Sequence, residues 1–178
     1  MDLRVKRTLK SIKEAFYQIR KKKPIKKISV KELSETAMIN KATFYLHYKD
    51  VYDLSDKLET ELISDVIDSV RKYDLRKGKT EFRLFAENLS RELVAHSKEI
   101  GIFISGDDDE NDFINHLEDK IKEYIFTTFP NIPNNNEINI ILTLFIQGSY
   151  HAHIRNKTID PEILIATTTQ LFMRLIDV

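Results

Sequence analysis

Residues 28–54 read ISVKELSETAMINKATFYLHYKDVYDL. Ser29 and Glu32 have the spacing of a capping box, in which the serine hydroxyl accepts a hydrogen bond from the glutamate amide and the glutamate carboxylate can reach back. The stretch therefore predicts a short helix over Val30–Ala37, with the apolar side chains of this segment turned inward.

The segment that follows predicts a second short helix. Met38–Asn40 forms a turn, and Asn40 is a favourable N-cap for a helix from Lys41 to about Tyr48. Asp50 then caps a long helix over Val51–Tyr73, with leucine and valine recurring about every four residues. Two short helices joined by a three-residue turn are typical of a helix-turn-helix, whose second helix lies in the major groove of DNA.

The sequence before this stretch supplies the helix on which the helix-turn-helix packs. Its apolar residues step by 4, 3, 4 and 3 positions and define one face of a helix that ends before Pro24. These residues are Val5, Leu9, Ile12, Phe16 and Ile19.

The sequence after it is apolar at helical spacing, and its four glycines and four prolines leave long uninterrupted segments. We expect helices from Thr80, a predicted N-cap, to about Ser97, and then over Glu110–Thr128, Glu137–Asn156 and Pro161–Ile176, with a break at residues 101–109. The prediction is an all-α protein with a three-helix headpiece over residues 1–50 and a helical body over 51–178.

Charge divides in the same way. The net charge of the 178 residues is zero, yet residues 1–49 hold fourteen Lys and Arg against four Asp and Glu, a balance of +10. The remainder carries −10. A basic headpiece beside an acidic body indicates that the headpiece binds a polyanion such as double-stranded DNA.

The second short helix carries side chains suited to that task. Lys41, at its start, is expected to reach base edges or nearby phosphates, and the polar residues after it are expected to bind phosphates. Phe44 and Tyr48 are expected to face inward. The predicted DNA-binding residues are Ser29, Lys31, Asn40, Lys41, Ala42, Thr43, Tyr45, His47 and Lys49.

This stretch resembles the headpiece of the TetR/AcrR family of bacterial regulators over roughly residues 4–55. The resemblance implies an all-α homodimer with a ligand-sensing body and a dimer face on the last two helices. Four positions depart from the family pattern: Met38 replaces the usual turn glycine, Ala42 replaces another small residue, often glycine, Leu46 replaces a polar residue, and Val51 replaces a lysine. A phosphate contact is therefore not carried over to position 51.

On this basis we expect a ligand-responsive repressor that binds a palindromic operator as a homodimer. A small apolar organic effector would shift the spacing of the two headpieces through the helix that begins at Val51, by binding one state better than the other. The expected pocket residues are Leu62, Phe85, Leu89, Phe103, Tyr124 and Phe145. The expected dimer face comprises Ile141, Leu144, Leu164, Thr168, Leu171, Phe172 and Leu175.

Other functional classes are less well supported by the sequence. An activator or co-regulator whose body binds a protein partner remains an alternative, distinguished by a filled core with an exposed apolar patch. Catalytic motifs and paired metal ligands are not recognisable, so we expect no enzyme, metal or cofactor. Cysteine is absent, no apolar run approaches the ~20 residues of a membrane span, and the N-terminus lacks a signal-peptide pattern, so a cytoplasmic location is expected.

Overall fold

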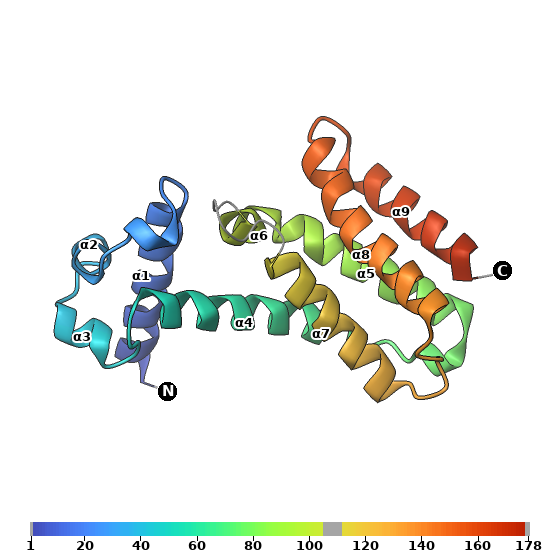
Figure 1. The fold of residues 1–178 in the computed structure, drawn as a ribbon, viewed down its shortest axis with the longest axis horizontal. Coiled ribbons are helices and arrows are strands. Elements are labelled where there is room, and N and C mark those ends of the chain that lie inside the picture. Colours follow the sequence, from blue (N-terminus) through green and yellow to red (C-terminus); the bar gives the residue numbers. More distant parts are fainter. Residues whose placement is uncertain (1, 105–111, 177–178) are drawn as a thin grey trace. The chain divides into compact units, whose positions relative to one another are not determined.

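The computed structural model describes residues 2–104 and 112–176, and within these ranges every regular element is helical (Figure 1). The predicted all-α class is confirmed. The chain forms two compact units. We use headpiece for the unit made of residues 1–62 and 101–110, and body for the unit made of residues 63–100 and 111–178. Within the described part, no helix is long and apolar enough to cross a membrane.

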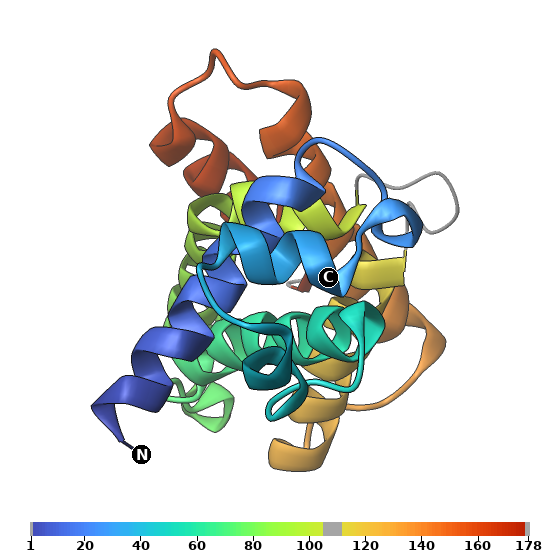
Figure 2. The ribbon, with the colours of Figure 1, turned by 90° about the vertical axis from the view of Figure 1, so that its left-hand side faces the viewer.

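The headpiece is built from α1 and the short helices that follow it (Figure 2). Its elements are α1 (Leu3–Arg20), the 3-10 turn η1 (Ile25–Lys27), α2 (Val30–Thr36), α3 (Lys41–Tyr45) and the first part of α4 (Val51–Val70). Each α-helix contributes a side chain that is at most 1% exposed, so one apolar core holds all four together. These side chains are Ile12, Phe16, Leu33, Phe44 and Leu54.

The boundary between the units differs from the one expected after Asp50. It falls inside α4, between Leu62 and Ile63. The reason is packing: Leu54 and Leu58 of α4 are buried, and Lys13 Nζ on α1 lies 2.8 Å from Glu61 Oε2 on α4. The first three turns of α4 therefore complete the headpiece core.

A helix that the sequence did not predict also contributes to the headpiece. α6 spans Ser97–Ile104 and contains Gly101, where a break was expected. Its Phe103 ring lies 6.3 Å from that of Phe16 and 6.1 Å from that of Tyr17. Burial of apolar α6 side chains outweighs the helix penalty of one glycine, about 1 kcal/mol. The rest of the expected break, residues 105–109, lies outside the described residues.

The body packs its helices around a second core. Its elements are the end of α4, the 3-10 turn η2 (Leu75–Lys77), α5 (Lys79–Ala95), the start of α6, α7 (Asp112–Thr128), α8 (Asn136–Arg155) and α9 (Pro161–Ile176). α5 packs on both α8 and α9, while α7 packs on α8. α4 ends at Val70 rather than at Tyr73. α5 begins at Lys79, with Gly78 rather than Thr80 in the N-cap position at a φ of +94°, and it ends at Ala95 rather than near Ser97.

The turn of the helix-turn-helix contains a residue in the left-handed region. Met38 has a φ of +55°, and its side chain is 93% exposed. The Met38 amide donates to the Glu35 carbonyl and the Ile39 amide to the Ser34 carbonyl, at 3.2 and 2.9 Å. This is the hydrogen-bond pattern of a Schellman motif, in which glycine is favoured because a Cβ is disfavoured at positive φ.

We therefore predict that Met38→Gly raises the free energy of unfolding by about 1 kcal/mol. A non-glycine residue in the left-handed region costs about 1–2 kcal/mol, and part of the gain from removing this cost is lost because glycine gives the unfolded chain more conformational entropy. Equilibrium unfolding in urea measures the difference. Met38→Ala is the matched control: it removes the same exposed side chain but keeps the Cβ, so it should leave stability nearly unchanged. Equal stabilisation by both variants would show that the backbone is not strained there.

Candidate nucleic-acid interface and body cavity

The candidate DNA-binding helix α3 is shorter than the sequence suggested. It ends at Tyr45 rather than near Tyr48, and Leu46 is its C-cap with helical dihedral angles. Asn40 caps it as expected, because Asn40 Oδ1 accepts hydrogen bonds from the Thr43 amide at 2.7 Å and the Thr43 hydroxyl at 2.8 Å. The Thr43 hydroxyl proton is thus already engaged within the cap, which leaves that oxygen as an acceptor rather than a donor.

α3 has a buried face and an exposed face. The Phe44 side chain is fully buried and the Tyr48 side chain is 8% exposed, with ring centroids 5.5 Å apart. Lys41, Ala42 and Tyr45 are exposed. The helix therefore presents cationic, small and phenolic side chains to solvent while its aromatic side holds it to the headpiece.

A carboxylate fixes the segment between α3 and α4. Asp53 Oδ2 accepts hydrogen bonds from the Lys49 amide and from Lys57 Nζ, each at 2.9 Å. Lys57 Nζ also donates to the His47 carbonyl at 3.1 Å, and the Asp53 amide donates to Asp50 Oδ1 at 2.9 Å. The hydrogen bond from Lys57, followed by that from the Lys49 amide, lowers the pKa of Asp53 below the usual range of an aspartate. Asp53, on α4, thereby holds the segment that follows α3 through the Lys49 amide.

Of the other predicted DNA-binding residues, Ser29 is the N-cap of α2 and Lys31 lies within it, whereas His47 and Lys49 lie between α3 and α4. Ser29 Oγ accepts a hydrogen bond from the Glu32 amide at 3.2 Å, which is one half of the capping box. The Glu32 carboxylate binds Lys23 Nζ at 2.5 Å. Of the nine predicted residues, the exposed ones are Ser29, Lys31, Asn40, Lys41, Ala42, Tyr45 and Lys49, and the half-buried ones are Thr43 and His47.

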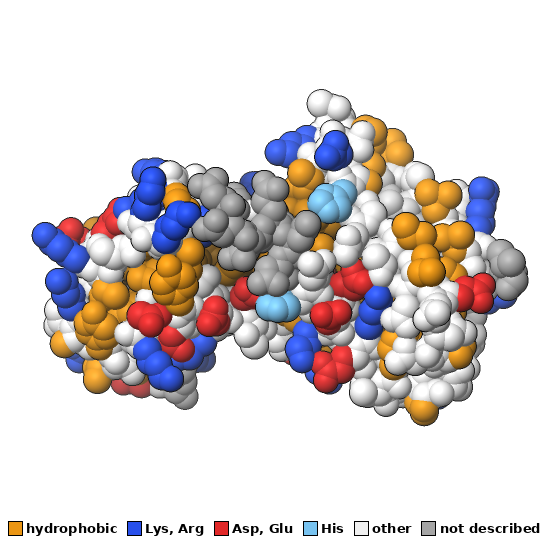
Figure 3. Space-filling view, in the orientation of Figure 1, with side chains coloured by type: hydrophobic (Ala, Val, Ile, Leu, Met, Phe, Trp, Pro, Cys, Tyr) orange, Lys and Arg blue, Asp and Glu red, His pale blue; other side chains and the backbone are white. Residues whose placement is uncertain are grey.

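A lysine-lined groove of about 490 Å³ lies between α1 and α4 of the headpiece and was not predicted. Its lining residues are Lys6, Leu9, Lys10, Lys13, Tyr48, Lys57, Leu58 and Glu61. The signal for it was present in the sequence, since Lys6, Lys10 and Lys13 recur at helical spacing on one face of α1. Lys and Arg side chains are distributed over the visible face of the headpiece (Figure 3), in agreement with the +10 balance of residues 1–49, which form most of this unit.

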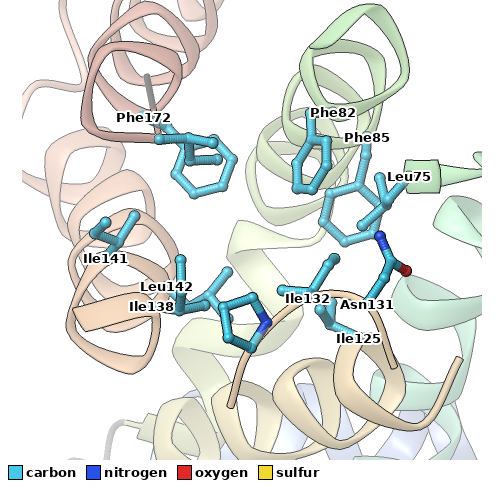
Figure 4. A pocket seen from close by; sticks show the side chains of 12 residues that line it. Leu75, Phe82, Phe85, Ile125, Asn131, Ile132, Ile138, Ile141, Leu142 and Phe172 are labelled. Carbon is cyan, nitrogen blue, oxygen red and sulfur yellow. The ribbon is translucent and has the colours of Figure 1, made fainter. Parts of the chain in front are cut away.

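The body contains a cavity of about 260 Å³, which we call the body cavity. Phe82 and Phe85 face Ile141, Leu142 and Phe172 across it (Figure 4). The remaining lining residues are Leu75, Ile125, Asn131, Ile132, Pro133, Ile138 and Ile176. Among these described residues, Asn131 supplies the only polar side chain of the lining. The body cavity thus offers apolar surface and one amide.

Of the six predicted pocket residues, Phe85 lines this cavity and the other five do not. Leu62 and Leu89 are buried core residues. Phe103 packs on α1 in the headpiece, and Tyr124 lies against Arg71 and Phe129. Phe145 stacks on Phe172 at 4.2 Å. Much of the lining of the body cavity comes instead from helix ends and the segment 131–133.

A second hollow in the body, the α8–α9 groove, has a volume of about 270 Å³. It is lined by Leu144, Phe145, Gly148, Ser149, Ala152, Thr168, Leu171, Phe172 and Leu175. Three residues of the expected dimer face remain largely exposed here: Leu144, Leu171 and Leu175, at 58, 53 and 43%. Ile141 and Phe172 are buried within the body instead, and Leu164 is half-buried. Ile140 and Ile163, both 59% exposed, add apolar surface on the same two helices that was not predicted.

A buried polar cluster connects α7 and α8. Glu118, 7% exposed, accepts hydrogen bonds from Lys122 Nζ and Gln147 Nε2 at 2.6 Å each and from the Thr143 hydroxyl. Lys122 Nζ also donates to Thr143 Oγ1 at 2.8 Å. Burial raises the pKa of Glu118, but the three hydrogen bonds together outweigh it, so the pKa lies below its ordinary value. The carboxylate is therefore charged and satisfied.

No protein-family model matches the sequence, and no curated protein matches it in sequence. Among solved structures, the chain is similar to the fatty acid degradation regulator FadR from Bacillus halodurans, with a TM-score of 0.63. The match covers 93% of this chain and 94% of that chain at 14% sequence identity. The two chains share an all-α fold over nearly their whole length.

The Asp53 contacts predict a pH-dependent contribution to stability. Because the folded-state pKa of Asp53 is lowered, the contribution is fully present above the ordinary aspartate pKa of about 3.9 and is lost as the pH falls through the lowered value. Asp53→Asn should therefore have a lower melting temperature than the parent at pH 7, and the difference between the two melting temperatures should become smaller near pH 3. Asp56→Asn, on the exposed side of α4, is the matched control. A gap that persists undiminished in acid would contradict the assigned role of the Asp53 charge.

Proposed function

We propose that the protein is a DNA-binding transcriptional regulator, and more specifically a repressor that binds a palindromic operator as a homodimer and responds to a small apolar effector. The observation that carries the proposal is the division of α3 into a buried aromatic face and an exposed face with Lys41, Ala42 and Tyr45. The shared fold with a protein named as a regulator supports it.

The geometry of the headpiece supports the proposal of DNA binding. The first two exposed residues of α3, Lys41 and Ala42, are at the end of the helix that meets base edges in a helix-turn-helix, while Tyr45 and Lys49 follow at positions suited to phosphates. The +10 balance of residues 1–49 supplies the sequence-independent attraction to DNA phosphates. Two such headpieces about 34 Å apart would read both halves of an operator.

Substitutions of these residues should weaken DNA binding in two distinguishable ways. Tyr45→Ala and Lys49→Ala should weaken binding to specific and scrambled duplexes alike, and Lys49→Ala should also lower the salt slope by about one. Lys41→Ala should instead reduce the difference in binding free energy between the specific and the scrambled duplex, by about 1–3 kcal/mol if the lysine makes a base contact. Titrations at several salt concentrations measure both effects.

The matched control for these titrations is Lys157→Ala, which removes an exposed lysine from the body. It should bind as the parent does. If Tyr45→Ala and Lys49→Ala also bind both duplexes as the parent does, α3 is not the helix on DNA.

The proposed homodimer places the exposed faces of α8 and α9 against a second copy. Hydrophobic side chains gather over these helices in the body (Figure 3), and Ile140, Leu144, Ile163 and Leu171 are each more than half exposed. Exposed apolar side chains gathered on two neighbouring helices are characteristic of interaction sites, and obligate dimer interfaces resemble a core cut in half. Two copies related by twofold symmetry would match the symmetry of a palindromic site.

Placing charges on this face should separate the subunits. We expect the parent to scatter light with about twice the mass of the 20.9 kDa chain, and the double variant Leu144→Glu/Leu171→Glu to scatter as a monomer. Leu3→Glu, which alters an exposed leucine of α1, should remain dimeric. A monomeric parent would remove the dimer from the proposal and favour the alternative in which this face binds a different protein.

The proposed effector binds in the body cavity. Its lining is apolar with one amide, so it favours a small molecule with an apolar body and at most a few polar atoms. α4 is one continuous helix that begins beside the DNA-binding segment and ends in the body, so a ligand that prefers one orientation of α4 would shift the population of DNA-competent dimers.

A straight-chain carboxylate, octanoate, is a suitable probe, since the structural neighbour is named for fatty acid degradation. At ten times its dissociation constant it should raise the melting temperature of the parent by about 3–6 °C. Ile138→Trp should fill the cavity from α8 and abolish the shift. Glu137→Trp, whose exposed side chain does not line the cavity, should retain it. An equal shift in both variants would place the binding site elsewhere.

A further inference from the structure

The centre of the exposed face of α3 is apolar. Successive residues of an α-helix turn by about 100°, so Ala42 and Leu46, each two positions from Phe44, point nearly away from the buried Phe44 ring. The C-cap Leu46 keeps helical dihedral angles, so this geometry extends to it. Its side chain is 80% exposed, and Ala42 is exposed beside it.

The surroundings of this apolar pair identify what it meets. Lys41 and Tyr45 lie next to it on α3, and α3 belongs to residues 1–49, whose charge balance is +10, so the face approaches a polyanion. Leu46 and Ala42 neither donate nor accept side-chain hydrogen bonds. Within the major groove, the apolar feature of a base edge is the 5-methyl group of thymine, whereas cytosine presents an amino group there. An aliphatic side chain against cytosine would leave that donor desolvated and unpaired.

We propose that Leu46, with Ala42 beside it, reads thymine methyl groups, and that the operator half-site therefore holds a fixed A·T pair opposite this part of α3. This inference rests on the proposed function, because it assumes that α3 enters the major groove. The inference goes beyond the proposed function because it names the chemical group that is recognised and the residue that selects this group.

The test uses the full-length protein and DNA that differs by single methyl groups. Selection from a random-sequence duplex library yields the preferred site, which is then synthesised with uracil in place of one thymine at a time. At one thymine in each half-site, loss of the methyl should weaken binding about fourfold, the factor that corresponds to burial of one methyl-sized group. Leu46→Ala should bind the thymine and uracil forms equally at that position.

Two further variants keep the result interpretable. Leu46→Ile retains an aliphatic side chain and should retain the preference for thymine, while Leu3→Ala removes another highly exposed leucine, on α1, and should leave the preference unchanged. All three variants should melt with the parent, since the altered side chains are exposed.

The outcomes separate the two proposals. If the parent binds a selected site but no thymine shows a methyl effect, or if Leu46→Ala keeps the full effect, the inference about Leu46 is overturned and the proposed function stands. If the parent selects no sequence from the library, the proposed function fails and the inference fails with it.

Discussion

The burial of Phe44 is the interaction on which the candidate DNA-binding surface depends. An isolated helix as short as α3 is unstable in water, because forming its first turn fixes several residues for very few hydrogen bonds. α3 persists because Phe44 is inserted into the headpiece core, with Tyr48 packed beside it. The orientation of every exposed α3 side chain follows from that one anchor. The Asp53 carboxylate then holds the segment after α3 in place through the Lys49 amide and Lys57.

Local signals made the headpiece predictable. The side chains of Ser29 and Asn40 cap α2 and α3 as expected, and each acts on an amide three residues away, so the sequence alone contains the necessary information. The body was harder to predict. α6 continues through Gly101 because its neighbours are buried, and the body cavity draws on Asn131 and Ile132 between helices. Such features depend on which helices meet, and apolar residues of a core and of a cavity are alike in sequence.

The body cavity and the α8–α9 groove share a side chain. Phe172 lines both, and its ring stacks on that of Phe145, which lines the groove, at a centroid separation of 4.2 Å. Protein interiors are close-packed, so a ring cannot move on one side without displacing its neighbours on the other. A ligand in the body cavity would therefore change the shape of the α8–α9 groove by displacing this aromatic pair. This effect would act within the body and would not depend on α4.

The polar cluster around Glu118 has a mechanical consequence. A slip of α7 along α8 by one helical turn, about 5.4 Å, would carry the buried carboxylate away from Thr143 and Gln147, two of its three donors. An unsatisfied buried charge is costly enough to make that slip improbable. The cluster thus holds α7 and α8 together as one rigid pair of helices. The contact between α8 and α9 at Phe145 and Phe172 is different in kind, because stacked aromatic surfaces can slide past one another without breaking a hydrogen bond between them.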